Sequence, residues 1–376
     1  MYWVAGISYW KALCPPRLEF DGPAPDAWQA RWLEALWRQG LAEFAWQNGL
    51  GEDIWPEFAH RPGSDEAKEC RLADEAIVPL GGGKDSLVAL ERVRARGLDT
   101  ITAATGQSAL IRQVAETTGL KHVFIGRRLD PGLARLNRQG AWNGHVPVTA
   151  INHAAMTVLA LATGRRWVVF ANERSAEEPT LLDGSGNPVN HQFSKSLDFE
   201  SRFSEWLQRY ISPSVGVFSI LRRDRELAIC REFSGLSRYH GHFSSCNRNF
   251  HLEGAPVAGR WCRNCPKCRF VFLGLAPFVQ AEALEAIFGG NLLADPGQES
   301  GFRELMALDG AKPFECVGEA AESRAALAAL ARNPFWARQV VVRTLGPELE
   351  GVVVPELDEL LVQDGPHRIP ERFLGP

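Results

Sequence analysis

One glycine-rich loop constrains the fold of this chain more than any other feature. Residues 77–86 read Ile-Val-Pro-Leu-Gly-Gly-Gly-Lys-Asp-Ser, and an amphipathic helix pattern follows until Gly97. Glycines allow a tight turn with exposed backbone N–H groups, and a helix start adds unpaired donors and a positive dipole end. The pattern predicts a strand, a phosphate-binding loop and a helix. The residues expected at the phosphate are Gly81, Gly82, Gly83, Lys84, Asp85 and Ser86.

The spacing within this loop excludes two familiar phosphate loops. A Walker A loop needs G-x-x-x-x-G-K-[ST], but its first glycine would fall at Val78, and Asp85 follows the lysine. The dinucleotide fingerprint G-x-G-x-x-G fails because Ser86 stands at its last glycine. The loop resembles the SGGxDS loop of the PP-loop ATP pyrophosphatases, with Gly81 in place of the leading serine. The resemblance implies that ATP is cut to AMP and pyrophosphate, with Mg²⁺ near Asp85.

An alternation of strand and helix patterns begins near residue 74 and predicts an α/β fold. Such alternation is typical of a parallel sheet covered on both faces, with ligands at the carboxyl ends of its strands. The resemblance implies a sheet of the PP-loop (HUP, adenine nucleotide alpha hydrolase-like) type. Strands are expected at 76–81, 99–104, 121–126, 166–171 and 216–221, and helices at 85–97, 108–118, 147–163 and 223–233. Residues expected at strand ends are Thr105 and Gly106, as adenosine contacts, and Asn172 and Glu173.

The chain of 376 residues divides into four regions. Residues 1–72 are rich in tryptophan, 73–240 carry the ATP-binding α/β pattern, 241–280 hold a cysteine-rich segment, and 281–376 form a C-terminal substrate or catalytic region. In the first region Asp26 is expected to cap a helix whose tryptophans and leucines recur at i, i+4 and i+8. Such a stripe is typical of core packing rather than of chemistry.

Charge and hydropathy disfavour several classes of partner. The net charge is -4, and no run of Lys and Arg is long enough to follow a nucleic-acid backbone. No apolar run reaches about 18 residues, so no membrane-spanning helix is expected. The first four residues lack the basic and apolar regions of a signal peptide. We therefore expect a cytoplasmic protein whose cysteines are reduced or bound to metal, while its oligomeric state stays open.

Four cysteines have the spacing of a metal site. Cys262, Cys265 and Cys268 form a C-x2-C-x2-C run, and fifteen residues separate Cys246 from it. Four thiolates at such spacing can surround one tetrahedral Zn²⁺, and an iron–sulfur cluster or unliganded thiols are the alternatives. A similar four-cysteine zinc site follows the PP-loop domain of 7-cyano-7-deazaguanine synthase. That similarity supports a zinc knuckle here and offers an alternative function.

The remaining cysteines are interpreted separately. Cys14, Cys70 and Cys230 are expected to be small buried hydrophobic residues. Cys316 lies in a polar, turn-rich stretch, Lys-Pro-Phe-Glu-Cys-Val-Gly-Glu at 312–319. This context makes it a candidate reactive thiol, with a purely structural role as the alternative.

Five stretches together resemble the ATP-dependent UDP-N-acetylmuramoyl-L-alanyl-L-glutamate epimerases of bacterial cell-wall synthesis. They lie at 79–86, 143–150, 189–196, 261–273 and 312–319. The resemblance implies an isomerase that adenylates the glutamate carboxylate of UDP-MurNAc-L-Ala-L-Glu, inverts its α-carbon and releases AMP. It implies ATP and Mg²⁺ as cofactors and a small-molecule substrate in peptidoglycan precursor synthesis.

Side-chain chemistry suggests roles in such a reaction. Cys316 is the first candidate for the proton-transfer base, as thiols serve in cofactor-independent amino-acid racemases, and Glu315 is the alternative. His145 and His191 lie in polar stretches and can bind substrate or move a proton, because imidazole titrates near neutral pH. Further candidates are Glu173 for catalysis and Asn172 and Lys195 for substrate contact, whereas His153 is expected to be a core histidine.

Two other functions fit the same patterns. In the first, an activated carboxylate or carbonyl is trapped by ammonia or sulfur, which gives an amide, a nitrile or a thiolated base. In the second, the chain is a nucleotide-binding or zinc-ribbon interaction module without catalysis, which residues 84–86 and the polar loops disfavour. A stable nitrogen- or sulfur-bearing product would favour the first, and a folded protein without ATP turnover would favour the second.

Overall fold

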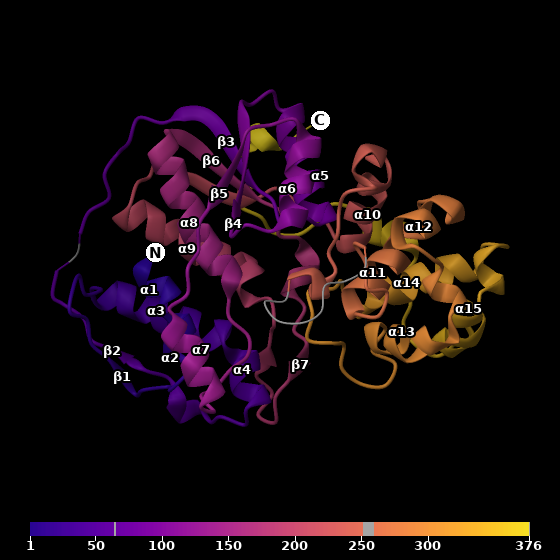
Figure 1. The fold of residues 1–376 in the computed structure, drawn as a ribbon, viewed down its shortest axis with the longest axis horizontal. Helices are drawn as coiled ribbons and strands as arrows, with labels where there is room; N and C mark the ends of the chain where they lie inside the picture. The colour runs from indigo at the N-terminus through magenta and orange to yellow at the C-terminus, as the bar shows by residue number, and fades with distance from the viewer. Residues whose placement is uncertain (64, 251–258, 376) are drawn as a thin grey trace.

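A five-stranded parallel sheet forms the centre of the computed structural model, which describes residues 1–63, 65–250 and 259–375. The strand order is β5-β4-β3-β6-β9, and every neighbouring pair is parallel. The strands are β3 (Ala73–Pro79), β4 (Thr100–Thr105), β5 (His122–Ile125), β6 (Arg165–Phe170) and β9 (Gly216–Ser219) (Figure 1). The predicted α/β class is confirmed. Because the strands are parallel, their carboxyl ends share one edge of the sheet.

Helices cover both faces of this sheet. Ala76 and Val78 of β3 lie in one core, together with side chains of α5 (Lys84–Ala95) and α10 (Glu226–Ser234). Ile77, between them, lies in a second core with side chains of α8 (Val148–Thr163) and α9 (Leu197–Tyr210). Successive residues of a strand point to opposite faces, so one apolar run supplies both cores.

The tryptophan-rich region packs over the second of these cores. Helix α3 (Ala27–Gly40) begins at Asp26, whose side chain accepts from two helix N–H groups, while Gln29 accepts from the Asp26 N–H. The predicted cap is confirmed. Trp32 meets Trp206 of α9, with ring centroids 4.6 Å apart, so the tryptophan stripe is core packing as expected. The short elements here are α1 (Tyr2–Ala5), α2 (Ile7–Trp10), β1 (Arg17–Leu18), α4 (Ala42–Gln47) and β2 (Glu57–Phe58), with β1 paired to β2.

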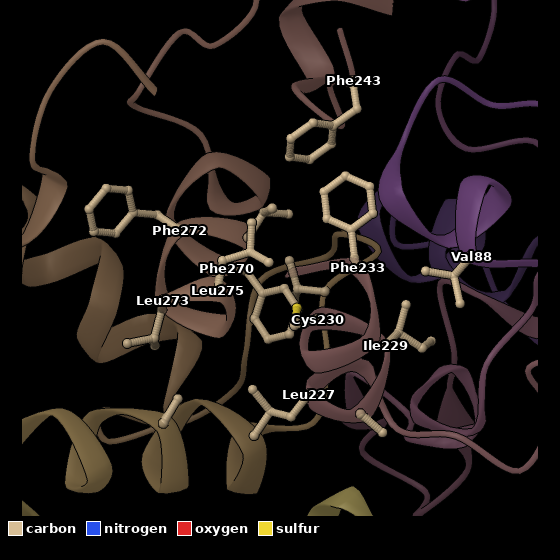
Figure 2. Close-up of a cluster of buried hydrophobic side chains, with 14 of the residues drawn as sticks. Val88, Leu227, Ile229, Cys230, Phe233, Phe243, Phe270, Phe272, Leu273 and Leu275 are labelled. Carbon is tan, nitrogen blue, oxygen red and sulfur yellow. The ribbon is translucent and has the colours of Figure 1, made fainter. Parts of the chain in front are cut away.

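A second group of helices follows the sheet along the chain. These are α11 (Pro266–Leu275), α12 (Ala281–Phe288), α13 (Glu299–Leu305), α14 (Ala320–Ala331) and α15 (Val340–Leu345) (Figure 1). Figure 2 shows Phe270 and Leu275 of α11 facing Leu227 and Cys230 of α10. One cluster of buried residues therefore joins this group to the sheet. None of the described helices is long and apolar enough to cross a membrane.

Several expected boundaries differ from the structure. Helix α9 is not among the expected elements, although Ser196 caps it and Phe199, Phe203 and Trp206 repeat at helical spacing. The polar stretch before it hides its start. The strands expected to reach residues 81 and 221 end at Pro79 and Ser219, and α10 begins at Glu226 rather than 223. The other elements are α6 (Ala109–Thr118), α7 (Pro131–Arg138) and the antiparallel pair β7 (Leu181–Leu182) and β8 (Pro188–Val189).

The burial of the isolated cysteines is confirmed only in part. Cys230 is buried as predicted, but Cys14 is half-buried and Cys70 is exposed. The prediction is wrong for Cys70 because it lies in a surface segment before β3, where its N–H donates to the Ser214 hydroxyl at 3.1 Å.

A buried carboxylate joins the C-terminal helices to the rest of the molecule. Glu322 of α14 accepts hydrogen bonds from the N–H groups of Leu227 (2.8 Å) and Glu319 (2.9 Å) and from the Ser175 hydroxyl (2.6 Å). Burial is the main cause that raises the pKa of Glu322 from 4.5 to about 7. Because the folded pKa exceeds the unfolded one, the protonated form stabilises the fold. This contribution is complete below pH 4.5 and is lost as the pH rises through about 7.

We expect Glu322→Gln to weaken this pH dependence, because the amide does not titrate. Between pH 4.5 and pH 8, the free energy of unfolding of the wild type should fall by up to about 3 kcal/mol more than that of the variant. Urea unfolding at a series of pH values measures the difference. Two parallel stability curves would show that Glu322 does not titrate in this range.

Candidate active site

The glycine loop joins β3 to α5 at the carboxyl edge of the sheet. Gly82 has a φ of +87°, which favours glycine, and Gly83 is the N-cap of α5. A Cβ on Gly83 would lie 2.5 Å from the Ser245 hydroxyl, and the Ser244 N–H donates to the Gly82 carbonyl at 3.0 Å. The Ser86 hydroxyl donates to the Gly83 carbonyl at 3.0 Å. The predicted order of strand, loop and helix is confirmed, while phosphate binding stays a prediction.

Lys84 lies buried beneath this loop among carboxylates. Its ammonium group donates to the carboxylates of Asp85 and Glu226. Burial alone would lower the pKa of Lys84, but the two carboxylates hold it well above its ordinary value. Burial and the charge of Asp85 raise the pKa of Glu226, and Lys84 opposes them. The loop therefore carries a buried cation that is permanently charged.

The neighbouring strand ends bring two of the predicted residues close to this cation. The Asn172 amide, after β6, donates to the Ser219 hydroxyl at the end of β9, at 3.1 Å. Glu173 is buried, and burial raises its pKa while Lys195 opposes the rise. Asp85 and Lys84 also contribute to that shift, so Glu173 belongs to the same electrostatic cluster.

A buried arginine fixes the backbone that carries these residues. Arg222 donates to the carbonyl oxygens of Glu173 (3.1 Å) and Lys195 (2.7 Å). The carboxylates of Glu177 and Glu200 each accept from the same guanidinium at 3.1 Å and neutralise it. The guanidinium thus ties two loop segments to the end of β9.

The two residues expected at the adenosine lie one strand further along the sheet. The Thr105 hydroxyl donates to the Asn152 side chain at 2.8 Å, and Gly106 has a φ of +81° with its N–H donating to the Ile125 carbonyl. Thr105 is the last residue of β4 and Gly106 follows it, and β4 neighbours β3. Their position at the carboxyl edge is confirmed, and their role stays a prediction.

A second polar cluster combines four residues from distant segments. The His191 Nδ1–H donates to the Glu43 carboxylate, and His145 Nδ1 lies 3.5 Å from the same carboxylate. The two imidazole rings have centroids 4.5 Å apart. His191 also interacts with the Cys316 thiol, and this interaction shifts the pKa of both groups. The structure thus brings together three of the predicted catalytic residues with Glu43, which the sequence does not mark.

Protonation differs between the two histidines. Burial would lower the pKa of His191, but hydrogen bonds with Cys316 and Glu43 raise it to about 9. Burial, with the charge of His191, lowers the pKa of His145 to about 3. Glu43, His145 and His191 also have ligand atoms within 4.8 Å of one another. Such a group can hold a metal ion, and without one a protonated His191 lies beside a neutral His145 at neutral pH.

The Cys316 sulfur lies among positive charges. Burial would raise its pKa, but Lys195, Lys267 and the hydrogen bond with His191 hold it well below its ordinary value. In turn, burial would lower the pKa of Lys195, but the charges of Cys316 and Glu173 raise it. These charges favour the thiolate form of Cys316 next to a protonated His191, and Lys195 also interacts with Glu173 beside the glycine loop.

Two other candidate residues, Glu315 and His153, are less suited to proton transfer. Burial raises the pKa of Glu315, so this carboxyl holds its proton more tightly than a free glutamate. His153 is fully buried, its Nδ1–H donates to the Thr149 carbonyl at 2.8 Å, and its ring stacks on Phe170 with centroids 3.7 Å apart. It is a core histidine, as predicted.

The four predicted metal-ligating cysteines converge. The sulfur atoms of Cys246, Cys262, Cys265 and Cys268 all lie within 4.8 Å of one another, with Cys265 and Cys262 at 3.4 Å and 3.7 Å from Cys268. Tetrahedral zinc with bonds of about 2.3 Å needs sulfur atoms about 3.8 Å apart. The group can hold a metal such as zinc. Residues 251–258 of the predicted 241–280 segment lie outside the described part of the chain.

The parallel sheet, with the glycine loop and Glu173 at its carboxyl edge, places the protein in the α/β class. Comparison with known proteins gives its family. The MurL N-terminal domain family matches residues 1–220, and the MurL C-terminal domain family matches residues 242–359. The chain belongs to the MurL family.

Curated relatives from three bacteria carry one name, UDP-N-acetyl-alpha-D-muramoyl-L-alanyl-L-glutamate epimerase. The protein of Xanthomonas oryzae pv. oryzae is 44% identical over 98% of this chain and 83% of its own length. The protein of Micromonospora sp. is 42% identical over 98% of this chain and 83% of its own length. That of Salinispora tropica is 41% identical over 91% of this chain and 74% of its own length.

Proposed function

We propose that this chain converts the terminal L-glutamate of UDP-MurNAc-L-Ala-L-Glu to D-glutamate in an ATP-dependent reaction that releases AMP and pyrophosphate. The name of the MurL relatives supports the epimerisation. The likeness of residues 79–86 to the PP-loop of ATP pyrophosphatases supports the use of ATP. Under this proposal the protein is a cytoplasmic isomerase of peptidoglycan precursor synthesis.

The reaction needs activation because the α-proton beside a carboxylate is barely acidic. Attack of the carboxylate oxygen on the α-phosphorus of ATP displaces pyrophosphate and forms an acyl-adenylate. The carbonyl of this mixed anhydride can accept the electron pair that remains when the α-proton leaves. Return of a proton to the opposite face inverts the carbon, and water then cleaves the anhydride to the carboxylate and AMP.

In this proposal the glycine loop holds the nucleotide. Residues 81–86 bind the pyrophosphate end through backbone N–H groups and the Lys84 charge. Thr105 and Gly106 contact the adenosine. The carboxylates of Asp85 and Glu173 supply the oxygen ligands that Mg²⁺ prefers, and the bound ion would neutralise the phosphate charge. Burial raises the pKa of Glu173, and a bound cation would lower it again by favouring the ionised form.

The second polar cluster is proposed to move the α-proton, and the position of Cys316 carries this step. Its thiol interacts electrostatically with His191 and with Lys195, which also interacts with Glu173 beside the loop. The thiolate takes the α-proton, and Lys195 faces the carboxylate that is to be activated. Glu315 and His145 are the candidates for the group that returns a proton on the other face.

The direct test is to incubate the protein with Mg-ATP and UDP-MurNAc-L-Ala-L-Glu. AMP should form, and hydrolysis of the product should yield D-glutamate. Incorporation of solvent deuterium at the α-carbon should accompany the inversion. AMP formation together with a stable nitrogen- or sulfur-bearing product would instead establish the amide-, nitrile- or thiol-forming reaction.

We also infer that the four-cysteine group holds one structural Zn²⁺. The sulfur spacing fits a tetrahedral site. Cys246 belongs to the segment that packs on the glycine loop, so the metal would also brace that loop.

Replacing Cys265 by alanine should therefore lower both zinc content and stability. Structural zinc binding is coupled to folding, so we expect zinc to fall from about one equivalent to near zero, together with a loss of soluble protein. Cys70→Ala, at an exposed cysteine outside the group, is the matched control. Metal analysis of the wild type that finds iron with sulfide, or less than stoichiometric metal, would refute the assignment.

A further inference from the structure

A cavity of about 660 Å³ lies beside the second polar cluster and takes no part in the roles described so far. It is bounded by α4, by the segment that follows it, and by the β7–β8 hairpin. Figure 1 shows α4 and β7 as neighbours at the lower edge of the molecule, and α4 contacts β8. Its volume falls within the range of about 300–1,000 Å³ that is typical of small-molecule sites.

The wall formed by α4 separates this cavity from the proton-transfer cluster. Ala42, Ala45 and Trp46 line the cavity on one side of the helix, while Glu43 reaches the histidines. Asn190 lines the cavity, and the next residue, His191, belongs to the cluster. The same segments thus build both the cavity and the cluster.

An aromatic contact leads from the cavity toward the thiol. The Trp46 ring is 46% exposed, and its centroid lies 5.2 Å from that of Phe314. Phe314 stands two residues before Cys316 on the same loop. In the substrate, the alanine residue and the lactyl ether connect the glutamate α-carbon to the sugar ring. Fully extended, this connection spans about 10 Å, the length of three residues. The contact between Trp46 and Phe314 gives a path along which a substituent attached through such a linker can extend from the Cys316 loop toward the cavity.

The lining of the cavity favours a neutral ring over a phosphate. Trp46 and Trp55 line the cavity, but the Trp55 ring is stacked with Trp10 and lies under the Arg38 guanidinium, so Trp46 supplies the open indole face. Carboxylates outnumber cations: Arg38 is paired with Glu52, and Glu177, Asp183 and Asp198 also line the cavity. Like charges would repel a diphosphate. A pyranose ring, in contrast, can place its apolar face on an indole and donate its hydroxyls to carboxylate oxygens, which accept several hydrogen bonds each.

We infer that this cavity is the sugar subsite, in which an N-acetylhexosamine ring stacks on Trp46. The inference rests on the proposed function, because the reacting glutamate is assigned to Cys316. It deepens that proposal by placing the sugar in the cavity and the diphosphate outside it. Trp46 is then a specificity-determining residue that recognises a part of the substrate remote from the chemistry.

Truncated substrates test the subsite. The Michaelis constants of the wild type and Trp46→Ala are compared for UDP-MurNAc-L-Ala-L-Glu, MurNAc-L-Ala-L-Glu and L-Ala-L-Glu. Loss of one stacking contact should raise KM about tenfold for both sugar-bearing substrates, with kcat within about twofold. The dipeptide should be turned over equally by both proteins. Phe335→Ala, at another exposed aromatic residue that does not line the cavity, should change none of these values.

Two outcomes overturn the subsite while leaving the proposed function intact. One is an unchanged KM for the sugar-bearing substrates. The other is an equal loss for L-Ala-L-Glu, which would mean that Trp46→Ala disturbs the Cys316 loop through Phe314. If the wild type does not epimerise the substrate at all, the proposed function fails. The sugar subsite can then still be tested by a binding experiment. Saturation-transfer NMR with MurNAc-L-Ala-L-Glu should then show sugar-ring contacts in the wild type that are absent in Trp46→Ala, and equal signals in both would overturn it.

Discussion

Replacing Cys316 by serine should abolish exchange of the substrate α-proton with solvent deuterium while AMP still forms. A serine hydroxyl has nearly the same shape as the thiol, but it is far less acidic and stays protonated beside His191. Loss of a positioned proton-transfer group typically costs about 10²–10⁴-fold in rate, and we expect deuterium exchange to fall by that factor. The glycine loop is untouched, so adenylation and pyrophosphate release should remain within a few-fold of the wild type.

The control for this experiment is Cys70→Ser, at an exposed cysteine remote from both clusters. It should leave exchange and AMP formation unchanged. If Cys316→Ser exchanges deuterium at the wild-type rate, the thiol has only a structural role. Glu315, His145 and His191 would then be tested in that order. A loss of AMP formation in Cys316→Ser, with the fold intact, would mean that the thiol acts in adenylation rather than in proton transfer.

The sequence predicts the fold well where burial leaves a regular pattern. The run at 76–78 is apolar because its side chains enter cores on both faces of the sheet, and that run marks the central strand. Asp26 marks the start of α3 because its side chain satisfies N–H groups that the helix cannot. Helix α9 carries the same kind of pattern, but the polar stretch before it obscures where the helix begins, so it is not among the expected elements.

The candidate site is only partly visible in the sequence because its parts come from distant segments. The glycine loop and the cysteine run are local motifs, so spacing alone identifies them. Glu226 and Glu43, in contrast, lie 142 and 148 residues from their partners Lys84 and His191, and neither stands in a motif. Arg222 is buried because four acceptors converge on it, which only the folded chain reveals. Long-range pairing of single charges leaves no periodic trace that a sequence can show.

Removing the charge of Lys84 should have two separable effects. In Lys84→Met, the carboxylates of Asp85 and Glu226 lose the buried cation that they share. An unpaired buried charge typically destabilises a fold by about 3–5 kcal/mol, and urea unfolding should show a loss of that order. AMP formation should fall by about 10²–10³-fold, because the variant also lacks the charge proposed to stabilise the departing pyrophosphate.

The double variant Lys84→Met/Glu226→Gln separates these effects. Neutralising Glu226 removes the main unpaired carboxylate, so most of the lost stability should return, with an unfolding midpoint close to that of the wild type. AMP formation should stay low, because neither substitution restores a cation at the phosphate. Recovery of AMP formation along with stability would mean that Lys84 only neutralises its neighbours and that the nucleotide binds elsewhere. Low AMP formation in a stable double variant, with Glu226→Gln alone retaining turnover, would place the ammonium group of Lys84 at the reacting phosphates.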